Sequence, residues 1–317
     1  MYEIAVRRAR AAGLLATLVL GGSMWLPGAL VQASQAVFRS GTDQVVLFAT
    51  VRGSDGRLIA DLQQDAFEVF DDGVRAPIAV FSNAIQPITA VVLADTSGSM
   101  GMSEHPRLQA ALRLFVRDLR PEDRLRIGSF GVEIALGFAL TGDRAVLERT
   151  IAEELWIGGT SPVWRAIDAG MTSLEDEPGR TVVVVMTDGV DYSPGGTVGL
   201  PALPGGFGAL RRRAEASGRL LLYAIGFGDP KRGQQLRGDI VDLVRVTGGG
   251  HVDLSPTRDL GQILVEVGEE LRRQYIIGFA PRFRDGKTHP VKLRIAVDGA
   301  TVRARSTYLA PVAERSR

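Results

Sequence analysis

The sequence contains no cysteine and only three histidines among its 317 residues. The absence of cysteine excludes disulfide bonds, thiolate metal sites, cysteine nucleophiles and a lipid-modified N-terminal cysteine. Three histidines leave almost nothing from which to build a zinc site or a histidine-based catalytic site. Any metal that this chain binds is therefore expected to have oxygen ligands.

The chain also lacks a large net charge, because its 37 Lys and Arg residues are balanced by 36 Asp and Glu residues. The charged residues are scattered along the chain and form no basic or acidic block. A protein that binds a polyanion carries a concentrated basic surface, so nucleic acid is not an expected partner. A membrane is an expected partner only if the N-terminal segment stays attached.

Residues 1–36 have the pattern of a signal peptide. Arginines near the start precede an uncharged run over 11–33 that contains helix-breaking Gly and Pro, and small residues offer cleavage after Ala33 or Ala36. The alternative is an uncleaved anchor, because an apolar run of about 20 residues can span a bilayer. Both interpretations place the rest of the chain outside the cytoplasm: periplasmic or secreted in the first case, membrane-anchored and facing outward in the second.

Two β-rich segments, 37–87 and 274–317, flank the centre of the chain. Both contain short apolar runs with Asp-Gly turns, such as Asp72-Gly73 and Asp298-Gly299. Few-stranded sheets are marginal in water, so the two segments are predicted to pack together as one small β-sandwich around an inserted domain. The alternative is two separate small sheets, each lying on the central domain.

The centre, residues 88–273, alternates strand and helix patterns. Such alternation is typical of an α/β fold, a doubly wound and mostly parallel sheet covered on both faces. The strands are expected at 88–95, 124–130, 133–140, 181–189, 220–228 and 250–254, and the helices at 107–120, 143–155, from 162 onward, near 240–246 and at 257–273.

Oxygen-bearing side chains follow the ends of these strands. Asp95, Ser97 and Ser99 come directly after the first strand, Thr160 precedes a helix, and Asp188 ends the four-valine strand. In open parallel sheets ligands bind beyond the carboxyl ends of the strands. A hard divalent ion such as Mg²⁺ takes about six oxygen ligands, some of them water. The pattern therefore predicts a site for Mg²⁺, with Mn²⁺ or Ca²⁺ as other possible occupants.

These residues resemble the metal-ion-dependent adhesion site (MIDAS) of the von Willebrand factor type A (VWA) domain. That motif is Asp-x-Ser-x-Ser followed along the chain by a separate Thr and a separate Asp, and all five positions are filled. The flanking segments resemble a bacterial exported subgroup of VWA proteins. The resemblance implies a non-enzymatic binding module. An Asp or Glu of a protein or peptide partner would complete the coordination of its metal ion. The chain departs from the family in a lengthened loop, 190–208, and in Trp164 where Tyr is expected.

Other interpretations stay open. The hydroxyls could simply cap helices and Asp188 could end in an ordinary turn. The ion could only stiffen the loops of an exported scaffold. An Asp after a buried strand also suits a magnesium-dependent hydrolase, although the second Asp that such enzymes carry two residues later is Ser97 in this chain. Trp156 and Trp164 are expected to pack in the core rather than to form a binding rim. The sequence does not indicate an oligomeric state.

Overall fold

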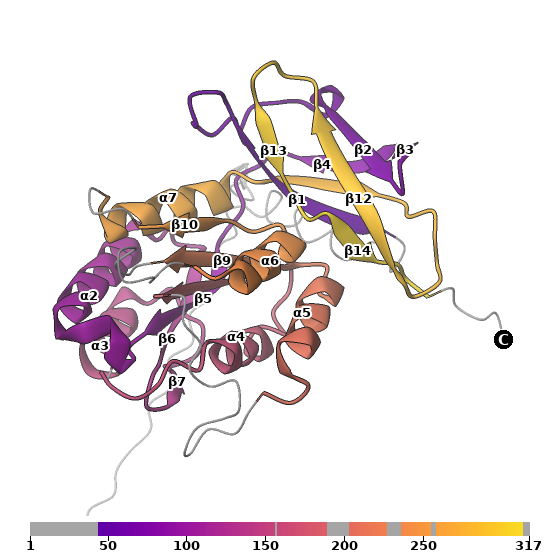
Figure 1. The fold of residues 1–317 in the computed structure, drawn as a ribbon. Coiled ribbons are helices and arrows are strands. Elements are labelled where there is room, and N and C mark those ends of the chain that lie inside the picture. The colour runs from indigo at the N-terminus through magenta and orange to yellow at the C-terminus, as the bar shows by residue number, and fades with distance from the viewer. Residues whose placement is uncertain (1–43, 156, 189–202, 227–235, 255–257, 313–317) are drawn as a thin grey trace, which may run out of the picture.

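The computed structural model describes residues 44–155, 157–188, 203–226, 236–254 and 258–312 (Figure 1). The predicted signal segment, residues 1–36, lies outside these residues. No helix in the described part of the chain combines the length and the apolar character needed to cross a membrane.

The central unit is built on a six-stranded sheet in the order β10-β9-β8-β5-β6-β7. Five of these strands run parallel and the short edge strand β7 runs antiparallel to β6. Strand β8 shows why the sheet lies at the centre, because all seven of its residues are buried and four of them are valine. The strands are β5 (Thr89–Asp95), β6 (Arg124–Phe130), β7 (Ile134–Leu136), β8 (Thr181–Thr187), β9 (Leu220–Gly226) and β10 (His251–Asp253).

Helices cover both faces of this sheet, as the doubly wound prediction requires (Figure 1). Helices α2, α3 and α7 pack on one face, over side chains such as Val92 and Val184. Helices α4, α5 and α6 pack on the other face, over Val91 and Val183. The helices are α2 (Gly101–Asp118), α3 (Arg144–Glu153), α4 (Val163–Thr172), α5 (Gly206–Ala216), α6 (Gly238–Thr247) and α7 (Leu260–Arg272), with short 3₁₀ turns η1 (Gln64–Ala66) and η2 (Gly98–Met100).

The flanking strands form two four-stranded sheets, ordered β13-β1-β11-β4 and β14-β12-β2-β3. Each sheet contains strands from both ends of the chain, since β1 pairs with β11 in the first sheet and β12 pairs with β2 in the second. The prediction of one composite sandwich is confirmed, and the alternative of two separate sheets is wrong. The strands are β1 (Val45–Arg52), β2 (Phe67–Asp71), β3 (Val74–Ala76), β4 (Ile78–Ser82), β11 (Tyr275–Phe279), β12 (Thr288–Ile295), β13 (Thr301–Arg303) and β14 (Thr307–Leu309).

The sandwich has its own core and also packs on the central unit. Leu47, Ile277 and other inward side chains of the two sheets form one apolar cluster. Phe48 and Ile276 alternate to the opposite face and join the core beneath α2 and α7. Successive side chains of β1 and β11 therefore point alternately into the core of the sandwich and into the core of the central unit.

Several predicted boundaries were wrong. Helix α2 begins at Gly101 instead of residue 107, because the η2 turn leads directly into it and Pro106 lies inside it. Strand β7 ends at Leu136 instead of residue 140, because the Gly137 N–H bonds back to Ile127. Helix α5 begins at Gly206, within the stretch predicted to be loop up to residue 208, and the short strand β14 was not predicted at all.

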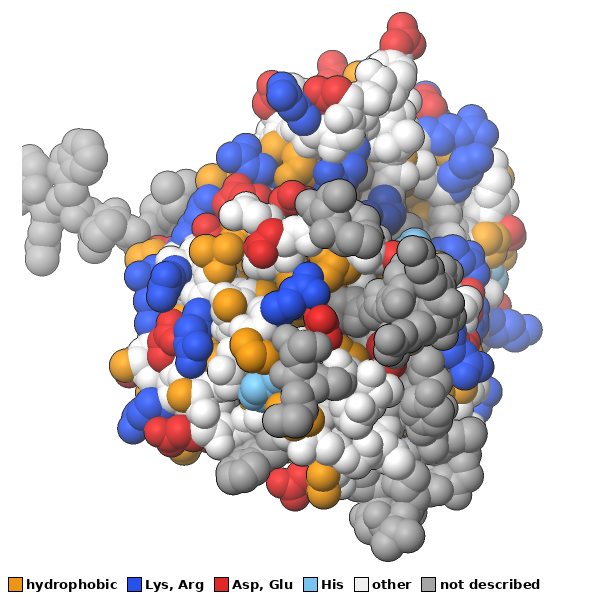
Figure 2. All heavy atoms as spheres, turned by 60° about the vertical axis from the view of Figure 1, so that its left-hand side comes forward, with side chains coloured by type: hydrophobic (Ala, Val, Ile, Leu, Met, Phe, Trp, Pro, Cys, Tyr) orange, Lys and Arg blue, Asp and Glu red, His pale blue; other side chains and the backbone are white. Residues whose placement is uncertain are grey.

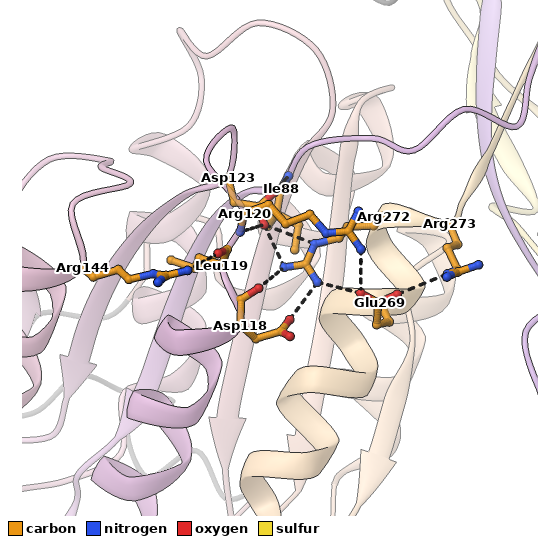
Figure 3. A network of polar contacts seen from close by, with 9 residues as sticks. All are labelled: Ile88, Asp118, Leu119, Arg120, Asp123, Arg144, Glu269, Arg272 and Arg273. Atoms are coloured by element: carbon orange, nitrogen blue, oxygen red, sulfur yellow. Dashed lines mark hydrogen bonds and ion pairs between the residues drawn. The ribbon is translucent and has the colours of Figure 1, made fainter.

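A buried arginine connects helix α7 to the far end of the central sheet (Figure 3). The Arg272 side chain is 1% exposed and contacts the carboxylates of Asp118 and Asp123 at 2.8 Å and of Glu269 at 3.0 Å. The other oxygen of Asp123 accepts a hydrogen bond from the Ile88 N–H at 2.8 Å. One guanidinium thus joins the end of α2, the end of α7 and the chain entering β5.

Candidate metal centre

Two carboxylates lie at the carboxyl end of the central sheet. Strands β5 and β8 are parallel neighbours, with Ala94 opposite Met186. Asp95 therefore ends β5 at the same edge at which Asp188 follows β8, and each residue is 1% exposed. The sheet itself brings together two residues that are far apart in the sequence.

The Asp95 carboxylate is held by three neutral donors. Its Oδ1 accepts a hydrogen bond from the Ser97 N–H at 3.0 Å. Its Oδ2 accepts from the hydroxyl of Ser161 at 2.8 Å and from that of Thr187 at 2.7 Å. Burial raises the pKa of Asp95 above its ordinary value of 3.8, and the hydrogen bonds oppose this shift only in part.

The two serines of the loop after β5 lie side by side. The hydroxyls of Ser97 and Ser99 are 3.0 Å apart. Ser97 is buried whereas Ser99 is exposed, so the pair leads from the buried Asp95 toward the surface. Alternate residues of this loop therefore share one side, as the spacing predicts.

The loop that carries Thr160 is attached directly to the loop after β5. The Gly98 N–H donates to the Gly159 carbonyl at 3.1 Å, and the Gly158 N–H donates to the Thr96 carbonyl at 2.8 Å. Thr160 is half-buried and stands between Gly159 and the Ser161 that bonds Asp95. The backbone thereby places the Thr160 segment beside the serines.

The helices that follow these two loops have no side-chain cap at their N-cap residues. The N-cap positions of α2 and α4 are Met100 and Pro162, and neither residue forms a side-chain cap hydrogen bond. Ser97, Ser99 and Thr160 all lie before these positions. The three hydroxyl residues therefore lie just before α2 and α4 but are not the N-cap residues of these helices.

The donor set fits a hard divalent cation. Among the described residues no Lys or Arg forms an ion pair with Asp95, so its buried negative charge lacks a cationic partner there. Burying an ionised carboxylate without a counter-charge is costly, and a metal ion would supply that charge. No group of three or more His, Cys, Asp and Glu side chains in the described stretches is arranged to hold a metal. An ion at this position would therefore need hydroxyl as well as carboxylate ligands. The candidate ligands are Asp95, Ser97, Ser99, Thr160 and Asp188.

Sequence reasoning missed Ser161 and Thr187, which donate to Asp95 and orient it. Both are neighbours of predicted ligands, so a hydroxyl residue directly beside a ligand position was the available signal. Trp164 packs against Phe207, with ring centroids 4.8 Å apart, in agreement with its predicted place in the core. Trp156 and most of the lengthened loop, 190–202, lie outside the described residues.

One protein family and several solved structures match parts of the chain. Residues 90–190 match the family described as the von Willebrand factor type A domain. Among solved structures, the chain is similar to BatB from Bacteroides thetaiotaomicron, at 15% identity over 58% of this chain and 98% of that one, with a TM-score of 0.45. A von Willebrand factor type A protein from Catenulispora acidiphila is 12% identical over 86% of this chain and 76% of that one, with a TM-score of 0.48.

A third similar structure is the manganese-loaded TRAP protein of Plasmodium vivax, at 15% identity over 77% of this chain and 100% of that one, with a TM-score of 0.45. No curated protein sequence matches the chain.

Proposed function

We propose that this protein binds a protein or peptide ligand through a divalent cation, because residues 90–190 match the von Willebrand factor type A domain, a family of adhesion and interaction modules. The observation that carries the proposal is the buried Asp95, whose carboxylate is oriented by three neutral donors and faces no Lys or Arg in the described residues. A buried carboxylate that is oriented by neutral donors and has no Lys or Arg beside it suits binding of a metal ion better than a structural ion pair.

The proposed ligands of the ion are the side chains of Asp95, Ser97, Ser99, Thr160 and Asp188. Mg²⁺ is the proposed occupant, with Mn²⁺ or Ca²⁺ able to replace it, since all three prefer oxygen. The bound ion supplies a positive charge that a carboxylate can coordinate. Ser97, Ser99 and Thr160 are neutral ligands, so an ion to which a carboxylate of the set is joined through water rather than directly keeps positive charge for a further ligand. The proposed partner therefore presents an Asp or Glu.

We also propose that the protein acts outside the cytoplasm, with residues 1–36 as a cleaved signal peptide or an uncleaved anchor. The proposed division of the remainder is 37–87 and 274–317 for the sandwich and 88–273 for the VWA domain. Charges of both signs are interspersed over the described part of the face in Figure 2. This mixed surface supports a partner selected by a local metal contact rather than by long-range charge.

A pull-down from cell-envelope extract tests this function. Wild type and Asp95→Ala are each used with Mg²⁺ and with chelator. We expect at least one partner that only wild type retains, and only with Mg²⁺. Identical partners in all four conditions would contradict the metal-bridged mechanism and would favour a scaffold whose ion only stiffens the loops. Hydrolysis of a phosphorylated or ester substrate that is lost in Asp95→Ala would instead indicate an enzyme.

A further inference from the structure

A second site of interest lies far from the candidate metal centre, where the sandwich meets the central unit. A cavity of about 270 Å³ lies between strands β1 and β13 on one side and β9, β10 and α7 on the other. Polar and charged groups form one part of its lining and apolar side chains the other. The charged members are Arg52, Arg258, Arg303, Glu266 and Glu270, and the aromatic members are Tyr223 and His251.

Positive charge exceeds negative charge in this lining. Arg52 and Arg303 both form ion pairs with the single carboxylate of Glu270, which is 4% exposed. Arg258 pairs with Glu266 at 2.5 Å. Three guanidinium groups thus share two carboxylates, and one positive charge remains without a counter-charge among the lining residues.

Glu270 has little capacity left to neutralise that charge. Its Oε1 accepts from Arg303, from the Tyr223 hydroxyl at 2.5 Å and from the Thr50 hydroxyl at 3.2 Å. Its Oε2 accepts from Arg52 at 2.6 Å. A carboxylate offers about four lone-pair positions, and four donors already point at this one.

Arg303 retains a donor without an acceptor. Its Nε is buried and has no hydrogen-bond partner among the described residues. Arg180 and Arg305 also have such a nitrogen, but of the three only Arg303 is in the lining of this cavity. Leaving a buried donor unsatisfied is costly, and a bound acceptor would remove that cost.

We propose that this cavity binds a small organic molecule through an oxyanion, a carboxylate or a phosphate. Guanidinium groups recognise such oxyanions through paired N–H donors, and the excess charge and the unpaired Nε of Arg303 provide both requirements. Ile263, Val267 and Val252 line the same cavity and would cover the apolar part of the ligand. Because Arg303 belongs to the sandwich and Arg258 to the central unit, the ligand bridges the two units.

The site is independent of the metal centre, so the two proposals fail separately. Isothermal titration calorimetry with acetate, succinate and inorganic phosphate, at constant ionic strength and with chloride as the reference anion, measures binding to the full chain. We expect saturable binding of succinate or phosphate with a Kd below about 10 mM. The same Kd is expected in the presence of chelator and in Asp95→Ala.

Two variants and a matched control assign the binding to this cavity. Arg258→Gln removes a cation that is 40% exposed on its side chain, and Arg303→Lys keeps the charge but removes the Nε donor. Both are expected to weaken binding about tenfold or more. Arg245→Gln, which removes a similar exposed pair with Asp242 on α6, is expected to leave the Kd unchanged. No saturable binding by wild type, or equal binding by wild type and both cavity variants, would overturn the proposal.

Discussion

At the scale of single residues, the decisive feature is the carboxylate of Asp95. The fold buries it to 1% exposure and surrounds it with one backbone N–H and two hydroxyls. These contacts fix the direction of both oxygens before any ligand arrives. Hydrogen bonds to a metal-binding carboxylate orient it, and removing them typically costs 10–100-fold in metal affinity.

Ser161→Ala is therefore expected to weaken binding of Mn²⁺ or Mg²⁺ about tenfold. The variant removes the 2.8 Å hydrogen bond to Asp95 while keeping all five proposed ligands. Calorimetric titration with the metal ion measures the effect. Ser173→Ala is the control, because Ser173 hydrogen-bonds the Gly170 carbonyl at the other end of α4. Equal losses of affinity in the two variants would contradict a positioning role for Ser161.

The sequence identified the candidate ligands because each follows a recognisable strand or precedes a helix. Asp95, for example, ends an apolar run whose carboxyl end must lie at the edge of a parallel sheet. The supporting hydroxyls of Ser161 and Thr187 were not predicted. Their role depends on which way each side chain points across a gap between two loops, and no sequence pattern encodes that direction.

At the scale of elements, the loops of the proposed metal site depend on close backbone approach. Gly159 has φ 78°, and a Cβ there would lie 2.4 Å from the Val132 nitrogen. Gly56 has the same φ of 78°, but nothing lies within 4 Å of its Cβ position. The two glycines have the same φ and differ in the space around the Cβ position.

Replacing each glycine by alanine separates these effects. Gly56→Ala is expected to destabilise the protein by about 1 kcal/mol, the ordinary cost of a left-handed residue. Gly159→Ala is expected to cost about 3 kcal/mol and to reduce metal binding as well, because the Thr160 loop must move. Chemical denaturation and metal titration measure the two quantities. Indistinguishable results for the two variants would contradict the close packing of the loops.

Helix α7 offers a second matched pair, formed by the neighbours Arg272 and Arg273. Arg272 is buried among three carboxylates, whereas Arg273 is 48% exposed and pairs with Glu269 only (Figure 3). Arg272→Met is expected to lower the free energy of unfolding by about 3 kcal/mol or more, because Asp123 is left buried without its cation. Arg273→Met is expected to cost less than about 1 kcal/mol.

Urea denaturation of both variants provides the measurement. A loss for Arg272→Met no larger than that for Arg273→Met would show that the buried network contributes nothing specific.

The strongly patterned elements were predictable and the short ones were not. Strand β8 is a continuous apolar run whose sequence permits little else, and its prediction was correct. Strand β14 has three residues and forms only because β12 is already in place to pair with it. The start of α2 likewise depends on the η2 turn of the metal-site loop, which is a tertiary arrangement.

At the scale of the whole molecule, the two units are joined through a buried polar cluster around Glu270. Arg52 and Arg303 reach it from the sandwich, and Tyr223 reaches it from the central sheet. Burial alone would raise the pKa of Glu270. The positive charge of Arg303 and the hydrogen bonds from Tyr223 and Arg52 outweigh burial and hold the pKa below 4.5.

A carboxyl group with a lowered pKa in the folded state stabilises the protein above its unfolded pKa of about 4.5, and this contribution is lost as the pH falls through the folded value. Glu270→Gln lacks the titrating group but has nearly the same shape. We expect wild type to be more stable than the variant at neutral pH, and the two free energies of unfolding to converge in acid.

Chemical denaturation of both proteins between about pH 7 and pH 3 tests this behaviour. A difference in stability that stays constant across the range would mean that the charge of Glu270 does not hold the two units together.

The most direct test of the central claim is a titration of the purified protein with Mn²⁺, followed by the electron paramagnetic resonance signal of the free ion. We expect one bound Mn²⁺ per chain in wild type, displaced by excess Mg²⁺, and loss of that binding in Asp95→Ala. No binding by wild type, or undiminished binding by Asp95→Ala, would contradict a divalent cation held at Asp95.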